Sequence, residues 1–325
     1  MSDFGAAGQT TLGEDFGLYA GNANPDLARK ICRYLGKELG RAEIFEFANE
    51  NIFVKILDNV REKDVYLVQP TCSPVQKSIM ELLIMIDAFK RASAGRITAV
   101  VPYYAYGRSD KKDQPRVPIT ARLVADMIEV AGADRYITID LHAGQIQGFF
   151  SIPGDVLTAF HMLSDHFVSL ELGNAVVASA DLGFAKKSRN FAAKLGVPLA
   201  FVEKRRTGDD PRALATTVIG DVKGKDVVIV DDEVLTAGSV CEAAEIVREH
   251  GARDVYLSFT HGVLVPPASH RLHETRFHNI VTTNTLTIPT EKRLANMTVL
   301  SVASLLGEVI LRAHEGRSVG ELFNE

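Results

Sequence analysis

The chain has 325 residues, 46% of them hydrophobic and 24% charged, and its 36 basic and 41 acidic side chains give a net charge of −5. This composition excludes a largely disordered chain, and the slightly acidic balance gives no general attraction to nucleic acid. No apolar run approaches about 18 residues, so we expect no membrane span, and the polar, glycine-rich start is not that of a signal peptide. Three widely spaced cysteines predict no disulfide framework and indicate a reducing cytoplasm.

The length predicts about two domains, and apolar, β-branched segments alternate with segments of helical spacing along most of the chain. Such alternation is typical of an α/β fold, and strands that are apolar at consecutive positions predict parallel sheets buried on both faces. In chain order, the predicted strands are residues 65–69, 97–103, 136–140, 175–178, 199–203, 227–231, 255–260 and 280–283. The predicted helices are one that carries Leu27, Ile31, Leu35 and Leu39, and then residues 78–89, 121–131, 185–195, 240–250 and 302–313.

Residues 132–142 and 251–262 share one pattern, in which a glycine after a predicted helix is followed at once by a strand. Glycine suits the left-handed position after a helix. The repeat predicts two similar halves, and no proline- or serine-rich linker separates them near residues 153–163. We expect an N-terminal tail (1–15), a first domain (16–158), a second domain (159–315) and a C-terminal tail (316–325) that returns to the first domain.

The most informative segment is residues 227–239. A predicted buried strand ends with two adjacent carboxylates, Asp231 and Asp232, and a turn of small residues then leads into a helix. Ligands bind at this edge of a parallel sheet. Backbone N–H groups and two hydroxyls of residues 236–239 can surround a phosphate, and the carboxylates can accept hydrogen bonds from the vicinal hydroxyls of a ribose. The alternative is an acidic strand end followed by a capped helix, without a ligand.

This Asp-Asp pair followed by Thr-Ala-Gly-Ser resembles the ribose-phosphate loop of type I phosphoribosyltransferases. Further stretches narrow the resemblance to ribose-phosphate pyrophosphokinases, the phosphoribosyl pyrophosphate synthetases: residues 80–92, 140–150, 204–206, 219–222 and 315–319. The resemblance covers about residues 17–323. It implies two phosphoribosyltransferase-like α/β domains, each a mainly parallel sheet flanked by helices. It also implies an enzyme that transfers pyrophosphate from Mg-ATP to the C1 hydroxyl of ribose 5-phosphate, which gives 5-phosphoribosyl 1-pyrophosphate and AMP.

The resemblance implies roles for residues at the sheet edges. Ribose 5-phosphate is expected at Asp231, Asp232, Leu235, Thr236, Ala237, Gly238 and Ser239. His142 and Asp181, each near the end of a predicted strand, are the implied ligands of Mg²⁺, which needs few protein ligands beside phosphates and water. Taken alone, His142 can equally be a structural histidine. Leu235 stands where the family has an aspartate, and we expect ribose binding to survive on the Asp pair.

Lys204-Arg205-Arg206 follows a predicted strand and opens a polar stretch rich in glycine, proline and charge, which we interpret as a mobile lid. The resemblance assigns Lys204 and Arg206 the catalytic role of stabilising charge on the phosphate oxygens at the phosphorus under attack. Taken alone, they can also be ordinary basic residues of an exposed loop.

ATP binding is implied at two segments. Arg108 and Ser109 follow an aromatic stretch, although Ser109 stands where the family normally has glutamine and the segment alone can be a solvated loop. In the family, the other segment reaches into a neighbouring subunit and holds the adenine; here it contains Phe47, Asn49, Glu50 and Asn51. Asn49 and Asn51 replace acidic residues by groups that both donate and accept hydrogen bonds, which leaves the choice of base open.

Two other functions stay open. A phosphoribosyltransferase uses the same loop, but a single-domain transferase does not need the N-terminal half. A non-catalytic regulatory paralogue is compatible with the changes at Asn49, Asn51, Ser109 and Leu235, and the intact catalytic and metal positions argue against it. The resemblance implies ATP and ribose 5-phosphate as substrates, Mg²⁺ as cofactor, and a cytoplasmic homo-oligomer, a hexamer built from dimers, with no nucleic acid or membrane partner.

Overall fold

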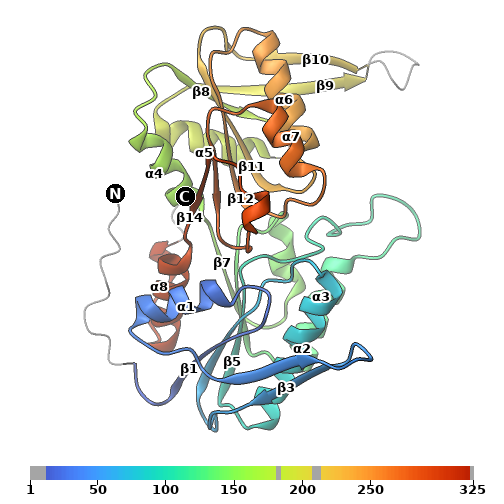
Figure 1. Cartoon of the computed structure of the whole chain (residues 1–325), viewed down its shortest axis with the longest axis vertical. Helices are drawn as coiled ribbons and strands as arrows, with labels where there is room; N and C mark the ends of the chain where they lie inside the picture. Colours follow the sequence, from blue (N-terminus) through green and yellow to red (C-terminus); the bar gives the residue numbers. More distant parts are fainter. Residues whose placement is uncertain (1–11, 181–183, 207–213, 323–325) are drawn as a thin grey trace. The chain divides into compact units, whose positions relative to one another are not determined.

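The computed structural model describes residues 12–180, 184–206 and 214–322. Their contacts divide the chain into two compact units, each with its own sheet (Figure 1). Unit 1 contains the described parts of Met1–Thr158, Thr285–Thr287 and Ser301–Asn324, and unit 2 contains those of Ala159–Asn284 and Ile288–Leu300. The sequence predicts a second domain that runs to residue 315, whereas the structure groups Ser301–Asn324 with unit 1. Within the described ranges, no helix is long and apolar enough to cross a membrane.

Unit 1 is built on a five-stranded sheet in which every neighbouring pair of strands is parallel. In spatial order, its strands are β1 (Phe16–Ala20), β4 (Asp64–Val68), β5 (Arg96–Val101), β6 (Arg135–Ile139) and β7 (Gly154–Leu157). The helices are α1 (Pro25–Leu35), α2 (Val75–Arg91), α3 (Thr120–Ala131) and α8 (Ala303–His314), and the 3-10 helix η1 spans Gly144–Phe149. An antiparallel hairpin of β2 (Ala42–Glu46) and β3 (Ile52–Ile56) lies against α2.

Helix α8 belongs to unit 1 because it packs on α1. Asn24 caps α1 by accepting a hydrogen bond from the Leu27 N–H at 3.2 Å, and the buried residues of the helix include Leu27, Ile31 and Leu35. The two helices approach closely at Gly307, where a side-chain carbon would collide with the ring of Tyr34. The Tyr34 hydroxyl also donates to Glu308 at 3.1 Å.

The end of α8 is held at the start of β4 by hydrogen bonds to the Asp64 carboxylate. A ring nitrogen of His314 lies 2.8 Å from the Asp64 carboxylate, and Arg96 donates to the same carboxylate at 2.8 Å. The contact joins residues 250 positions apart in the chain. No local sequence pattern predicts such a contact, which explains why the domain limit at 315 differs from the observed grouping.

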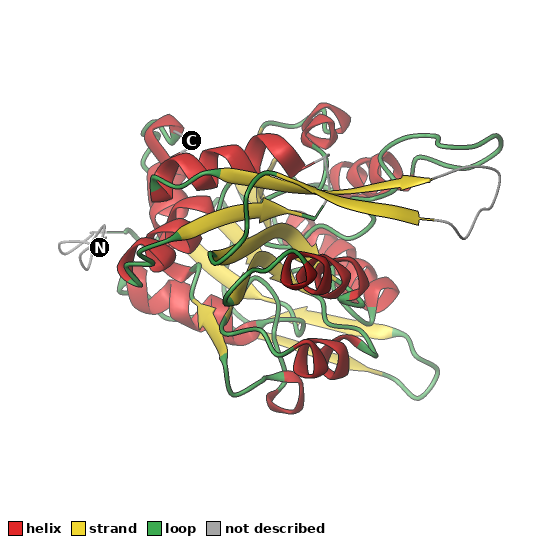
Figure 2. Ribbon diagram, turned by 90° about the horizontal axis from the view of Figure 1, so that it is seen from above, coloured by secondary structure: helices red, strands yellow, loops and turns green. Residues whose placement is uncertain are grey.

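Unit 2 contains a seven-stranded sheet that is parallel except for its first pair, β10 with β9. In spatial order, its strands are β10 (Leu214–Ile219), β9 (Leu199–Arg206), β8 (Ala175–Ser179), β11 (Asp226–Val234), β12 (Val255–Gly262), β13 (Ile280–Thr283) and β14 (Met297–Leu300). Its helices are α4 (Phe160–Ser169), α5 (Ala185–Leu195), α6 (Gly238–Glu249) and α7 (Ala268–Thr275). Figure 2 shows helices packed around the yellow strands.

The predicted α/β class with mainly parallel sheets is confirmed, and each of the eight predicted strands corresponds to an observed strand. The first predicted helix extends too far, because Gly36 adopts a left-handed conformation (φ 65°) and ends α1 before Leu39. Several shorter elements were not predicted: β1, β2, β3, β7, β10, β14, α4 and α7. Most are short or mix apolar with charged residues, so they lack the apolar run or helical spacing that marks the others.

Candidate active site

The segment from β11 to α6 in unit 2 contains the predicted ribose-phosphate loop. Buried apolar residues of β11 pack in the core of the unit, and the strand continues to Val234, three residues beyond its predicted end. Both carboxylates therefore lie within the last four residues of the observed strand. Asp232 is 5% exposed and Asp231 is partly exposed. The Asp231 carboxylate accepts a hydrogen bond from the Asp232 N–H at 2.9 Å, which fixes its orientation.

The turn that follows contains the backbone N–H groups at the start of α6. Ala237 is left-handed (φ 61°) and caps α6 without a side-chain hydrogen bond. Among the described residues, no backbone carbonyl accepts from the N–H groups of residues 236–239. The first N–H groups of a helix have no acceptor within it, and the helix dipole places partial positive charge there. The turn therefore has the kind of backbone donors that bind a phosphate, and phosphate binding here stays a prediction.

The connection from β12 to α7 supports this turn from one side. The N–H of Leu264 donates to the Val234 carbonyl and the N–H of Val265 to the Leu235 carbonyl, each at 3.0 Å. The guanidinium of Arg271 donates to the Thr236 carbonyl at 3.1 Å. No local sequence pattern marks Arg271, because its partner lies 35 residues earlier in the chain.

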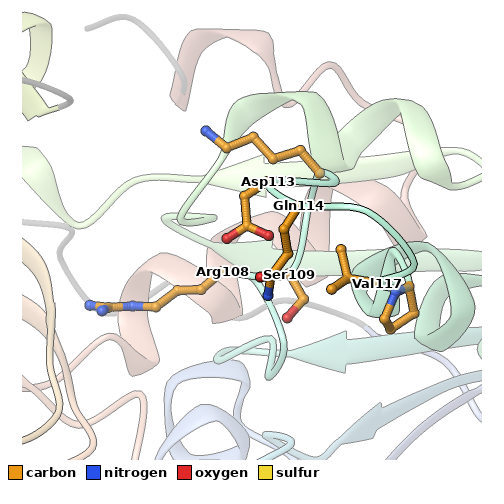
Figure 3. A pocket seen from close by; sticks show the side chains of 7 residues that line it. Arg108, Ser109, Asp113, Gln114 and Val117 are labelled. Carbon is orange, nitrogen blue, oxygen red and sulfur yellow. The ribbon is translucent and has the colours of Figure 1, made fainter.

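The loop after β5 in unit 1 places Arg108 and Ser109 at a pocket of about 270 Å³. The side chains around this pocket include two cations and one carboxylate: Arg108, Ser109, Lys111, Asp113, Gln114, Val117 and Pro118. Figure 3 shows the long side chain of Arg108 pointing away from Val117. The carbonyl of Ser109 accepts from the Ala121 N–H at 3.2 Å, so the loop is attached to the start of α3.

A buried hydroxyl anchors the base of the same loop. Thr71, which is 0% exposed, donates to the Tyr103 carbonyl at 3.0 Å and accepts from the Ala105 N–H at 2.7 Å. The Tyr104 hydroxyl donates to the Ala121 carbonyl at 2.8 Å, and burial raises the pKa of this phenol. The start of the loop is therefore held by groups in the interior of unit 1.

The structure brings His142 together with this loop. His142 is exposed after β6, and a side-chain carbon on Gly107 would lie 3.3 Å from the Cβ of His142. Gln145, in the helix that follows, donates to the Asp110 carboxylate. Two segments that were singled out separately in the sequence therefore meet at one edge of the unit 1 sheet.

The other predicted metal ligand, Asp181, lies outside the described residues. Within those residues, no group of three or more histidine, cysteine or carboxylate side chains is placed to hold a metal. His142 is exposed and can offer a ring nitrogen to a Mg²⁺ that takes its remaining ligands from phosphates and water.

The structure corrects the surroundings of Lys204 and Arg206. The sequence predicts a strand that ends at residue 203, before a loop. Strand β9 instead runs to Arg206, and the Lys204 position is paired with that of Thr216 on β10. The side chains of these residues, and residues 207–213 of the predicted lid, lie outside the described part of the structure.

The predicted adenine segment forms the tip of the β2–β3 hairpin. Phe47 is 49% exposed, and its ring packs edge-on against Phe45 with centroids 5.0 Å apart. The side-chain oxygen of Asn49 accepts from the Asn51 N–H at 3.2 Å, and Glu50 is left-handed (φ 67°). One of the substituted residues therefore uses its acceptor oxygen to stabilise the turn.

A mainly parallel, helix-flanked sheet with two carboxylates near the end of a central strand is the arrangement of the phosphoribosyltransferase type of fold. Family comparison narrows this class. Residues 16–132 match the N-terminal domain of ribose phosphate pyrophosphokinase, and residues 209–324 match the phosphoribosyl synthetase-associated domain.

Individual relatives match this chain over nearly its full length. A ribose-phosphate pyrophosphokinase of Caldanaerobacter subterraneus is 49% identical over 307 residues, which are 94% of this chain and 97% of that protein. Ribose-phosphate pyrophosphokinase 2, chloroplastic, of Arabidopsis thaliana is 46% identical over 94% of this chain and 77% of that protein. The crystal structure of phosphoribosylpyrophosphate synthetase from Mycobacterium smegmatis has a TM-score of 0.88 at 42% identity, covering 93% of this chain and 99% of that one. The chain belongs to the ribose-phosphate pyrophosphokinase family, which confirms the resemblance found in the sequence.

Proposed function

We propose that this protein transfers the pyrophosphoryl group of ATP to the C1 hydroxyl of ribose 5-phosphate, giving 5-phosphoribosyl 1-pyrophosphate and AMP. The turn after β11 carries the proposal, because its N–H groups at residues 236–239 lack backbone acceptors within the described ranges and follow shortly after Asp231 and Asp232. Membership of the pyrophosphokinase family, at 49% identity to a curated relative, supports it.

The turn and the carboxylates suit the two ends of ribose 5-phosphate. In the proposal, the N–H groups and hydroxyls of Thr236–Ser239 donate to the 5-phosphate, while Asp231 and Asp232 accept from the ring hydroxyls. Leu235 adds no polar group, so the hydroxyls depend on these two carboxylates. The sugar is thereby oriented by both ends, which lowers the entropic cost of presenting its C1 hydroxyl to the nucleotide.

The transfer itself forms one bond and breaks another. The C1 oxygen attacks the β-phosphorus of ATP, the bond from that phosphorus to the oxygen of the α-phosphate breaks, and AMP leaves with the electron pair while the hydroxyl proton is released. Negative charge on the phosphate oxygens must be stabilised during this step. The proposal assigns this role to Lys204 and Arg206.

Arg108 and Ser109 are the proposed nucleotide contacts in unit 1. Arg108 and Lys111 at the pocket supply the cations that phosphates require, and Phe47, Asn49, Glu50 and Asn51 form the proposed base-binding segment. His142 and Asp181 are the proposed protein ligands of Mg²⁺. When bound, this ion would polarise the phosphate oxygens and offset their charge.

The protein is further proposed to form a homo-oligomer, a hexamer built from dimers. It is also proposed to act in a reducing compartment such as the cytoplasm. All three cysteines are free thiols, Cys32 and Cys241 are buried, and burial raises the pKa of both. Such thiols are largely protonated and react slowly, which is compatible with a reducing environment.

Product analysis tests the proposal. The purified protein would be incubated with ribose 5-phosphate and Mg²⁺ together with ATP, GTP, UTP or CTP in separate reactions, and products would be identified by mass spectrometry. We expect 5-phosphoribosyl 1-pyrophosphate with the nucleoside monophosphate, and the spread across nucleotides measures the effect of Asn49 and Asn51. A folded protein that forms no product from any nucleotide would support the regulatory paralogue instead.

A further inference from the structure

Three successive carbonyls, at the end of β11 and in the turn after it, accept hydrogen bonds from the same neighbouring segment. Residues 264–271, from the end of β12 into α7, donate to the carbonyls of Val234, Leu235 and Thr236 in turn. The first two bonds come from backbone N–H groups at 3.0 Å, and the third comes from a side chain, that of Arg271. Helices α6 and α7 lie side by side, which brings this side chain to the turn (Figure 1).

The hydrogen bond from Arg271 to the Thr236 carbonyl sets the direction of the Ala237 N–H. The Thr236 carbonyl belongs to the same planar peptide as the Ala237 N–H, and in a trans peptide these two groups point in opposite directions. Because Arg271 holds this carbonyl on the side of α7, the Ala237 N–H is directed to the other side. The backbone bonds to Val234 and Leu235 act in the same way on the next N–H groups, so successive donors face away from residues 264–271.

The turn needs this support because its backbone is strained. Ala237 has a φ of 61°, a left-handed conformation that is unfavourable for a residue with a side chain. No side chain caps the start of α6. The Arg271 bond therefore acts on the peptide next to the strained residue.

The charge of Arg271 is also available to an anion. Within the described ranges, no carboxylate forms an ion pair with its guanidinium. A side-chain carbon on Gly238, the first residue of α6, would lie 3.4 Å from the same Arg271 nitrogen. The guanidinium therefore adds an uncompensated positive charge to the positive end of α6.

We propose that Arg271 is a positioning residue for ribose 5-phosphate: it holds the peptide between Thr236 and Ala237 so that the N–H groups of the turn face the 5-phosphate. This inference rests on the proposed function, in which residues 236–239 bind that phosphate. Arg271 acts through the turn and not on the reacting atoms. Its loss is therefore expected to affect the sugar substrate and to spare ATP.

Three variants of the full-length protein test this role. R271M removes the donor and the charge but keeps the aliphatic stem, R271K keeps the charge, and R276M removes a cation from the exposed end of the same helix. Binding of ribose 5-phosphate is measured by titration calorimetry without ATP. The KM of each substrate, kcat and the melting temperature are measured in parallel.

We expect R271M to weaken the binding of ribose 5-phosphate about tenfold and to raise its KM to the same extent, with the KM for ATP changed less than about twofold. R271K retains part of the lost affinity, and R276M binds as the wild type does. Unchanged binding in R271M, equal losses for both substrates together with a lower melting temperature, or no recovery in R271K would each overturn the inference. A wild-type protein that neither binds ribose 5-phosphate nor forms AMP would instead overturn the proposed function and this inference with it.

Discussion

Gly107 lies directly against His142 in unit 1, so that a side-chain carbon at residue 107 would approach the Cβ of His142 to 3.3 Å. The same carbon would lie 3.4 Å from the Tyr104 carbonyl and 3.8 Å from Ile146. The loop that carries Arg108 and the segment that carries the proposed metal ligand are thus packed without room for a larger residue. The position of one constrains the position of the other.

This relationship predicts that Gly107→Val displaces His142. Overpacking at this buried site is expected to lower the free energy of unfolding by about 1–2 kcal/mol, and the Mg²⁺ concentration for half-maximal turnover is expected to rise about tenfold. Turnover measured over a Mg²⁺ series checks it. Gly148, which has no atom within 4 Å of its added carbon, offers a matched control in G148V. An unchanged Mg²⁺ dependence in G107V would contradict the assignment of His142.

Thr71→Val tests whether the buried hydroxyl positions the Arg108 loop. The change keeps the shape of the side chain but leaves the Ala105 N–H without its acceptor, which costs about 1–3 kcal/mol. We expect the KM for ATP to rise severalfold while the KM for ribose 5-phosphate stays constant. Steady-state kinetics with each substrate varied in turn measures the difference.

Thr98 provides the control for this variant. Its hydroxyl is also buried in unit 1 but has no hydrogen-bond partner among the described residues, so Thr98→Val is expected to leave both KM values unchanged and to raise stability by about 1 kcal/mol. Equal effects of T71V and T98V on the KM for ATP would rule out the positioning role of Thr71.

The hydrogen bond from Tyr34 to Glu308 predicts that the packing of α1 on α8 depends on pH. Burial, reinforced by the nearby Glu308 carboxylate, raises the pKa of Tyr34 to about 12 from the ordinary value of 10.0. The neutral phenol donates to Glu308, so its contribution to stability is present below pH 10 and is lost as the pH rises toward 12. The free energy of unfolding of Tyr34→Phe should therefore be lower than that of the wild type at pH 8, and the difference should disappear near pH 12. Denaturant titrations across this range would refute the assignment if the difference stayed constant.

Lys204→Ala is expected to lower turnover by orders of magnitude with little change in folding, because it removes a cation that is proposed to stabilise charge on the transferred phosphoryl group. Lys223, an exposed lysine in the same unit, is the matched control. Rapid-quench measurement of AMP formation compares the two variants. Turnover near that of the wild type in K204A would show that this lysine has no part in the transfer.

The sequence predicted the parts of the fold that have a strong local pattern. Strands β4 and β8 and residues 227–230 of β11 are nearly continuous apolar runs because both faces of each are buried. Helix α7 has a weak pattern, since only Ala268, Leu272 and Thr275 of its eight residues are buried. Strand β9 was predicted too short because its charged end pairs with β10, where local hydrophobicity carries no signal.

The residues of the candidate site also divide into those that a local sequence pattern marks and those that it does not. The motif of Asp231, Asp232 and the small residues after them is contiguous, so it can be predicted from the sequence. Arg271 and Thr71 were not found, because each acts through a hydrogen bond to a backbone carbonyl more than 30 residues away in the chain. Such bonds depend on how elements pack, and any residue type can provide the carbonyl.

The most direct test of the proposed transfer follows the oxygen of the sugar. Ribose 5-phosphate carrying ¹⁸O in its C1 hydroxyl would be incubated with the protein, ATP and Mg²⁺, and both products would be examined by mass spectrometry. Attack by this hydroxyl on the β-phosphorus predicts that all of the label is found in 5-phosphoribosyl 1-pyrophosphate, in the oxygen that joins C1 to phosphorus, with unlabelled AMP as the other product. Label in AMP, or ADP as the nucleotide product, would contradict pyrophosphoryl transfer to this oxygen.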